Sequence, residues 1–306
     1  MICLASSFLN LLFETITPII QHLCNLIMAT ERNISLNGTS YSDGKHLPVN
    51  NRGFLYGDSF FETIFVKQGK IPLWGYHFDR LKAASDFMAY KWPSHWNKRY
   101  FLNEIIRCVK ENKLSEARAR LVFFRNDGGS YIPETDNCSY VIECKLPQEN
   151  LFELNKPITI EIFDQFVKHQ DAASFFKHAN NLIYIIAGRF CKEKQLQQCL
   201  ILNQERHIAE GLSTNVFLLV EGKWFTPALT EACIDGVFRR FLIEKVFAPS
   251  ELVQSIVTEN TLEMAEEVFL CNAVQGIIPV NRWRDKSFQT ENTIQIHHKF
   301  IKTLLP

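Results

Sequence analysis

Apolar and polar residues alternate in short runs through the first half of the chain. The runs at 62–66 (ETIFV), 119–124 (ARLVFF) and 139–144 (SYVIEC) have the period and the β-branched and aromatic content of strands. Between them, residues 77–90 and 99–114 carry apolar side chains at helical spacing. This mixture of strands and helices predicts an α+β unit.

The second half contains shorter apolar runs in a different arrangement. They lie at 158–163 (ITIEIF), 199–203 (CLILN) and 216–227 (VFLLVEGKWFTP). The last run contains the sequence Glu-Gly-Lys, which is typical of a hairpin turn. We expect helices to begin near Asn180 and Gly236. Short strands joined by tight turns predict a barrel-like sheet with peripheral helices.

The chain therefore divides into two predicted domains. The polar, proline-bearing stretch KLPQENLFELNKP interrupts the apolar pattern between the two halves. We place a small N-terminal α/β sandwich at 29–148, a linker at 149–157 and a larger C-terminal domain at 158–306. The fold class predicted for the whole chain is α+β.

Residues 1–28 differ from the rest because they are apolar and contain neither Lys nor Arg. A secretory signal opens with positive charge, and Glu14 interrupts the apolar run that a membrane span needs. We interpret this segment as an over-called start or a disordered extension. A targeting or membrane segment is the alternative.

Charge and cysteine content narrow the classes of partner. The 33 basic residues balance the 33 acidic residues, which argues against binding to nucleic acid or to an anionic membrane. The nine cysteines form no C-x-x-C pair, so we expect reduced thiols, no metal site and a cytoplasmic protein. A small molecule is the expected ligand.

Lys177 is the first candidate for chemistry. It lies in SFFKHANN, behind two phenylalanines and before an apolar helix. Apolar surroundings shift a lysine toward its neutral, nucleophilic form. A lysine at a helix start whose head reaches solvent is the alternative interpretation of this segment.

Three further candidates are weak when each is taken alone. Glu210 precedes a glycine and a buried strand, where Glu-Gly is also ordinary turn chemistry. Arg80 lies on a helix, where an arginine is usually solvated. Gly236 opens a helix whose free N–H groups would favour a phosphate.

The order of these candidates resembles the class IV aminotransferase family, the fold-type-IV enzymes that use pyridoxal 5′-phosphate. That family includes branched-chain and D-amino acid aminotransferases and 4-amino-4-deoxychorismate lyase. The resemblance runs from about Asn37 to Val280. It rests on five blocks in family order: RGFLYGDSFFETI, HFDRL, the Lys177 region with EGLSTN, TPALTEACIDGVFR and EVFLCNAVQGIIPV.

The resemblance implies a role for each matching residue. Lys177 would hold pyridoxal phosphate as a Schiff base and move a proton at the substrate, and Glu210 would face the ring nitrogen. Arg80 would pair with the phosphate. The family also implies a site between the domains and a homodimer. The remaining expected cofactor contacts are Ser213, Thr214, Asn215, Val237, Phe238 and Ala273, and Tyr56 would stand in the pocket wall.

The subclass is less determined than the family. Branched-chain enzymes place threonines where Phe238 and Ala273 stand here, whereas FFET, KHAN, GVFR and CNA are closer to the lyase. The loop 125–134 lacks the arginine that a lyase would present to a substrate carboxylate, and Arg125 is the nearest cation in the sequence. We therefore put transamination between an amino acid and a 2-oxo acid slightly ahead of pyruvate release from 4-amino-4-deoxychorismate. A non-catalytic protein that keeps the fold is a third possibility.

Overall fold

The first half of the protein is built on one antiparallel sheet of five strands. The computed structural model describes residues 33–42, 47–148 and 150–304. The sheet has the order β2-β1-β5-β4-β3. Its strands are β1 (Ile34–Leu36), β2 (Thr39–Tyr41), β3 (Ser59–Lys67), β4 (Glu116–Arg125) and β5 (Cys138–Lys145), and its helices are α2 (Arg52–Tyr56), α3 (Trp74–Phe87) and α4 (Lys98–Glu111).

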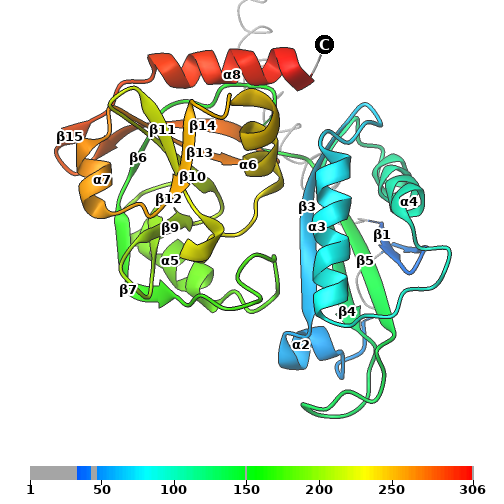
Figure 1. The fold of residues 1–306 in the computed structure, drawn as a ribbon. Helices are drawn as coiled ribbons and strands as arrows, with labels where there is room; N and C mark the ends of the chain where they lie inside the picture. Colours follow the sequence, from blue (N-terminus) through cyan, green and yellow to red (C-terminus); the bar gives the residue numbers. More distant parts are fainter. Residues whose placement is uncertain (1–32, 43–46, 149, 305–306) are drawn as a thin grey trace, which may run out of the picture.

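Strand β4 shows how the sequence pattern assigns the two faces of this sheet. Ala117, Ala119, Leu121 and Phe123 are fully buried in the core that α3 and α4 cover (Figure 1). The residues between them project from the opposite face, because side chains alternate along a strand. That opposite face is turned toward the second half of the molecule.

The second half has two open sheets. The larger has seven strands in the order β12-β11-β10-β13-β14-β15, with β6 on β14, and the smaller is β7-β8-β9. The strands are β6 (Ile158–Ile160), β7 (Ile162–Lys168), β8 (Leu200–Asn203), β9 (Ile208–Gly211), β10 (Asn215–Val220), β11 (Lys223–Pro227), β12 (Leu252–Ser255), β13 (Glu267–Asn272), β14 (Gly276–Trp283) and β15 (Lys286–Ser287). The helices are η1 (Leu229–Glu231), α5 (Leu182–Glu193), α6 (Val237–Phe241), η2 (Leu242–Val246), α7 (Glu259–Met264) and α8 (Glu291–Leu304).

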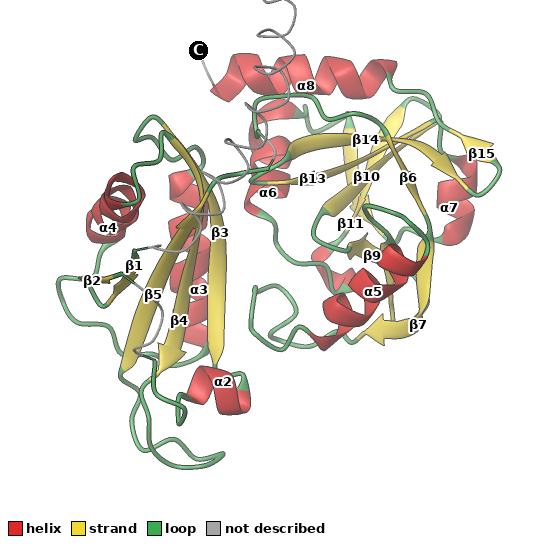
Figure 2. Cartoon of the chain, turned by 180° about the vertical axis from the view of Figure 1, so that it is seen from behind, coloured by secondary structure: helices red, strands yellow, loops and turns green. Residues whose placement is uncertain are grey.

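The predicted α+β class is confirmed, but the sheets of the second half do not close into a barrel. The chain bends between β9 and β10, where Gly211 N donates to Thr214 O at 2.7 Å. The two strands do not pair with each other: β9 is an edge strand of the smaller sheet, whereas β10 lies inside the larger sheet between β11 and β13. The helices lie outside the sheets, as the sequence predicted (Figure 2).

The segment around Lys177 joins the two halves. Its backbone pairs with β3, the last strand of the five-stranded sheet: Phe61 N donates to Lys177 O at 2.8 Å, and Ala179 N donates to Ser59 O at 3.0 Å. Lys177 is thus held by backbone hydrogen bonds at the junction of the two halves. The predicted segment 1–28 lies outside the described residues. None of the helices within the described ranges is long and apolar enough to cross a membrane.

Candidate active site

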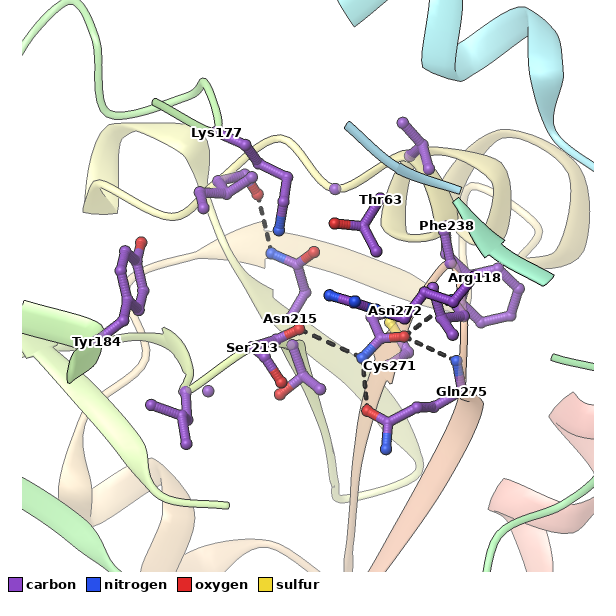
Figure 3. Close-up of a pocket in the computed structure, with 18 of the residues that line it drawn as sticks. Thr63, Arg118, Lys177, Tyr184, Ser213, Asn215, Phe238, Cys271, Asn272 and Gln275 are labelled. Atoms are coloured by element: carbon purple, nitrogen blue, oxygen red, sulfur yellow. Dashed lines mark hydrogen bonds between the residues drawn. The ribbon is translucent and has the colours of Figure 1, made fainter. Parts of the chain in front are cut away.

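A cavity of about 680 Å³ lies between the two halves. Figure 3 shows its side chains converging from the five-stranded sheet, from the Lys177 segment, from β10 and β13, and from α5 and α6. The cavity brings together nine of the eleven site residues that the sequence predicted. These are Arg80, Lys177, Glu210, Ser213, Thr214, Asn215, Val237, Phe238 and Ala273.

Lys177 has the properties of a reactive amine. Burial and the positive charge of Arg80 lower the pKa of Lys177 to about 8, although Glu62 and Glu210 act in the opposite direction. Its Nζ lies over the ring of Phe61, 5.2 Å from the ring centre. A substantial fraction of the amine is therefore neutral near pH 8 and available as a nucleophile.

Glu210 lies on β9 at the centre of a buried network of donors. Its Oε1 accepts hydrogen bonds from Lys168 Nζ and from the Tyr184 hydroxyl, both at 2.6 Å, and its Oε2 accepts one from Ile234 N at 2.8 Å. Burial and the charge of Glu210 raise the pKa of Tyr184 well above its usual value, so Tyr184 remains a neutral donor. Three donors, one of them a cation, therefore fix the position of the Glu210 carboxylate.

Lys168 and Tyr184 were not predicted as site residues. Lys168 is 42 residues from Glu210 in the sequence, and β7 and β9 bring them together only through β8. Tyr184 lies in the first turn of α5, 26 residues before Glu210. No sequence signal indicated either contact.

Arg80 reaches the cavity from α3 but is already held by a buried carboxylate. Its Nε and Nη2 donate to Glu62 at 2.7 and 2.8 Å, and its Nη1 donates to Asp235 O at 2.9 Å. Burial alone would raise the pKa of Glu62, but the Arg80 charge lowers it to about 2. A guanidinium carries five N–H donors, so two remain available toward the cavity. Glu62, which fixes Arg80, was not predicted.

The start of α6 offers donors at the same place. Its N-cap, Gly236, has no side-chain capping bond, so the first N–H groups of the helix, at Val237 and Phe238, face the cavity without a cap. A Cβ on Gly236 would lie 1.9 Å from Asn215 Oδ1, so only glycine fits there. Thr214 Oγ1 is buried and has no hydrogen-bond partner within the described chain. These orphan donors fit an anionic group such as a phosphate.

Tyr56 and Arg125 lie outside the lining of this cavity. Arg125 is buried, and its guanidinium donates to Asp58 at 3.0 Å, to Asp136 at 2.9 Å and to Met88 O at 2.6 Å. Tyr56 lies on α2, and its ring centre is 5.9 Å from that of Tyr131. Arg125 is therefore committed to contacts of its own. Tyr56 lines a neighbouring cavity together with His178 and Tyr184, and its place in the substrate pocket stays a prediction.

Two arginines that were not predicted do line the cavity. Arg118 and Arg120 project from β4, and the Arg120 guanidinium lies over the Phe61 ring, 3.9 Å from its centre. Neither has a hydrogen-bond or ion-pair partner among the residues that the structure describes. Burial and the adjacent Arg118 lower the pKa of Arg120. The alternation Ala-Arg-Ala-Arg at 117–120 would have indicated that both arginines share one face.

Comparison with known proteins agrees with this geometry. Residues 59–283 match the family model described as amino-transferase class IV. An aminodeoxychorismate lyase of Vibrio harveyi is 26% identical over 240 residues, which cover 77% of this chain and 87% of that protein. Both subclasses considered from the sequence are thus represented among the relatives and the solved structures described next.

Solved structures share the fold. The branched-chain amino acid aminotransferase of Escherichia coli superposes with a TM-score of 0.80 at 19% identity, covering 90% of this chain and 95% of that chain. The Thermobaculum terrenum branched-chain aminotransferase, solved in its PLP form, has a TM-score of 0.76 at 16% identity, covering 90% and 94%. The family model spans well over half of the sequence and contains Lys177, Glu210 and the start of α6. The chain is therefore an enzyme of the class IV aminotransferase family.

Proposed function

We propose that this enzyme binds pyridoxal 5′-phosphate on Lys177 and acts on an amino substrate that carries carboxylates. When bound, the cofactor supplies an electron-accepting ring for chemistry at the carbon next to the amine. The residues of the cavity supply its other requirements. The proposal is supported by their fit to the three parts of the cofactor: its carbonyl, its ring nitrogen and its phosphate.

Each part of the cavity takes a distinct role in this proposal. The Lys177 amine, with a pKa of about 8, first carries the cofactor and then moves a proton at the substrate carbon. Glu210, held by Lys168 and Tyr184, keeps a negative charge against the ring nitrogen. The free N–H groups of α6, Thr214 Oγ1 and the spare donors of Arg80 hold the phosphate.

The carboxylate preference rests on one observation, the unpaired arginines of β4. Arg120 lies over Phe61, and the Lys177 amine lies over the same ring, so a substrate amine at Lys177 would be close to this guanidinium. An arginine that is partly removed from water gains most from a carboxylate partner. A branched-chain amino acid carries only its α-carboxylate, so it would leave one of the two arginines without a partner.

These arginines change the order of the two candidate reactions. Pyruvate release from 4-amino-4-deoxychorismate ranked second because Gly128-Gly129 in the loop 125–134 is followed by Ser130 and Tyr131 and not by an arginine for a substrate carboxylate. Arg118 and Arg120 supply cations from β4 instead, and the objection no longer applies. We therefore place the lyase reaction, which forms 4-aminobenzoate and pyruvate, first.

Transamination is the second candidate, because it needs the same lysine and the same acid. A dicarboxylic amino acid would satisfy the same arginines. Incubation with 4-amino-4-deoxychorismate and no 2-oxo acid should release pyruvate, whereas a transaminase should show no release. Turnover seen only with an amino acid and 2-oxoglutarate would reverse our order.

We also propose that the working unit is a homodimer. Apolar side chains are exposed together on α2, on the loop after β4 and on α5. Phe54 is 80% exposed, Tyr131 91% and Ile185 61%. Large exposed apolar groups of this kind mark protein interfaces. Light scattering coupled to size-exclusion chromatography should give twice the mass of one chain, and a monomeric mass would contradict the proposal.

A further inference from the structure

Arg118 and Lys145 form a cationic pair on the wall of the cavity. They are direct neighbours in the register of β4 and β5, and both line the cavity with Gln148. Arg118 is two residues from Arg120, so both arginines project from the same face. On its other side, Arg118 is in register with Phe65, which is buried in the core shared with the second half. Figure 3 shows Arg118 among the side chains that surround the cavity.

The charges on this wall are not balanced by the protein. Lys145 Nζ lies 3.0 Å from Glu143 Oε2, which accounts for one of the three cations Arg118, Arg120 and Lys145. Within the described part of the chain neither Arg118 nor Arg120 forms an ion pair, and the acid that acts on Arg120 is Glu143, its neighbour in register, which is already paired with Lys145. Like charges that face a partly enclosed cavity repel each other, and an anion between them relieves that repulsion. Two of the three cations remain without a neutralising acid, so the wall can bind two substrate carboxylates and not only one.

We propose that Arg118, together with Lys145, forms a second anion subsite that binds a carboxylate remote from the one at Arg120. Arg118 is then a specificity-determining residue that selects substrates with two carboxylates. This inference rests on the proposed function, because it assumes that the substrate amine is placed at Lys177. It goes further by assigning the two substrate carboxylates to different arginines.

A comparison of the binding of two small anions distinguishes the second subsite from the rest of the site. Glutarate carries two carboxylates and butyrate carries one, with similar chain length, so their dissociation constants measured by calorimetry on the holoenzyme report the second subsite. The parent protein should bind glutarate more tightly. Arg118→Met should raise the dissociation constant of glutarate by about tenfold to a hundredfold, which corresponds to the loss of one charge-assisted hydrogen bond. The dissociation constant of butyrate should stay nearly unchanged. Arg118→Lys should recover part of the loss.

The matched control is Arg189→Met on α5, whose guanidinium is exposed and paired with Glu193. It should change neither constant. An equal loss for both anions in Arg118→Met, or no preference for glutarate in the parent, would overturn the subsite. The proposed function would be contradicted by a different result, a cofactor that is not attached to Lys177. The absorbance spectrum and borohydride labelling of the parent protein measure that attachment independently of anion binding.

Discussion

Lys168 Nζ lies 2.6 Å from Oε1 of Glu210 in a buried ion pair, and the Tyr184 hydroxyl donates to the same oxygen. Lys168 is therefore a positioning residue, which acts on the cofactor through the carboxylate. Its contribution can be separated from that of Lys177, because Lys177 lines the cavity whereas Lys168 does not and contacts Glu210 from behind it.

We expect Lys168→Met to leave a buried carboxylate without its cation. Turnover should fall by about tenfold to a hundredfold, because an unpaired buried charge is costly and Glu210 is no longer held in place for the ring nitrogen. Steady-state kinetics of the holoenzyme measures this loss. Lys192→Met, in the exposed last turn of α5, is the control and should keep the parent turnover. Parent-like turnover in Lys168→Met would remove this residue from the site.

The pKa of Lys177 predicts how the cofactor attaches. The neutral amine is the reactive form, and the pKa of about 8 lies well below the ordinary value of 10.5. The rate at which cofactor-free protein takes up pyridoxal phosphate should therefore rise about tenfold per pH unit below pH 8 and level off above it. Stopped-flow absorbance measures this rate. A rate that keeps rising to pH 10 would show that the amine is not depressed.

Glu62 should contribute to stability in a pH-dependent way. Its pKa of about 2 in the folded protein is below the ordinary 4.5, so the contribution is present above pH 4.5 and is lost as the pH falls toward 2. Glu62→Gln should reduce the free energy of unfolding by about 3 kcal/mol at pH 7, since it leaves Arg80 buried without its carboxylate. Glu116→Gln, in an exposed pair with Lys67, should cost about 1 kcal/mol or less.

Urea unfolding at pH 7 and at pH 3 checks this prediction. The difference in the free energy of unfolding between the parent and Glu62→Gln should narrow at pH 3. At that pH Glu62 is protonated in the unfolded chain but still ionised in the folded protein, so part of its contribution is already lost. If the difference in the free energy of unfolding is the same at both pH values, the ionised carboxylate of Glu62 is not its cause.

Arg125 should act on folding and not on substrate binding. Its guanidinium joins Asp58 and Asp136, so Arg125→Gln leaves both acids without their partner and should lower the free energy of unfolding by about 3 kcal/mol. The KM for the amino substrate should stay within about twofold of the parent at a temperature where the variant is folded. A large increase in KM with unchanged stability would return Arg125 to the substrate pocket.

The sequence indicated the parts of this molecule that are local. The runs at 62–66, 119–124 and 139–144 lie within β3, β4 and β5, because strand periodicity depends on neighbouring residues alone. Helices α5 and α6 begin at Leu182 and Val237, next to the expected starts. The barrel-like sheet was less well predicted, since the bend between β9 and β10 depends on how the chain packs and not on its apolar pattern.

The contacts that tune the site are long-range, and the sequence did not contain them. Arg80 and Glu62 are 18 residues apart, and Lys168 and Glu210 are 42 apart, so each pair forms only when the sheets and helices are assembled. The alternating arginines 118 and 120 were visible, but alternation does not say which face of the strand meets the cavity. Arg125 was the nearest cation in the sequence and is committed to other partners in space.

Borohydride reduction of the purified enzyme, followed by proteolysis and mass spectrometry, identifies the lysine that carries the cofactor. The reduction fixes pyridoxal phosphate to the lysine that carries it, independently of any turnover assay. We predict one phosphopyridoxyl group, on the peptide that contains Lys177, and none in Lys177→Ala. A group on any other lysine, or no attached cofactor in the parent, would contradict the account.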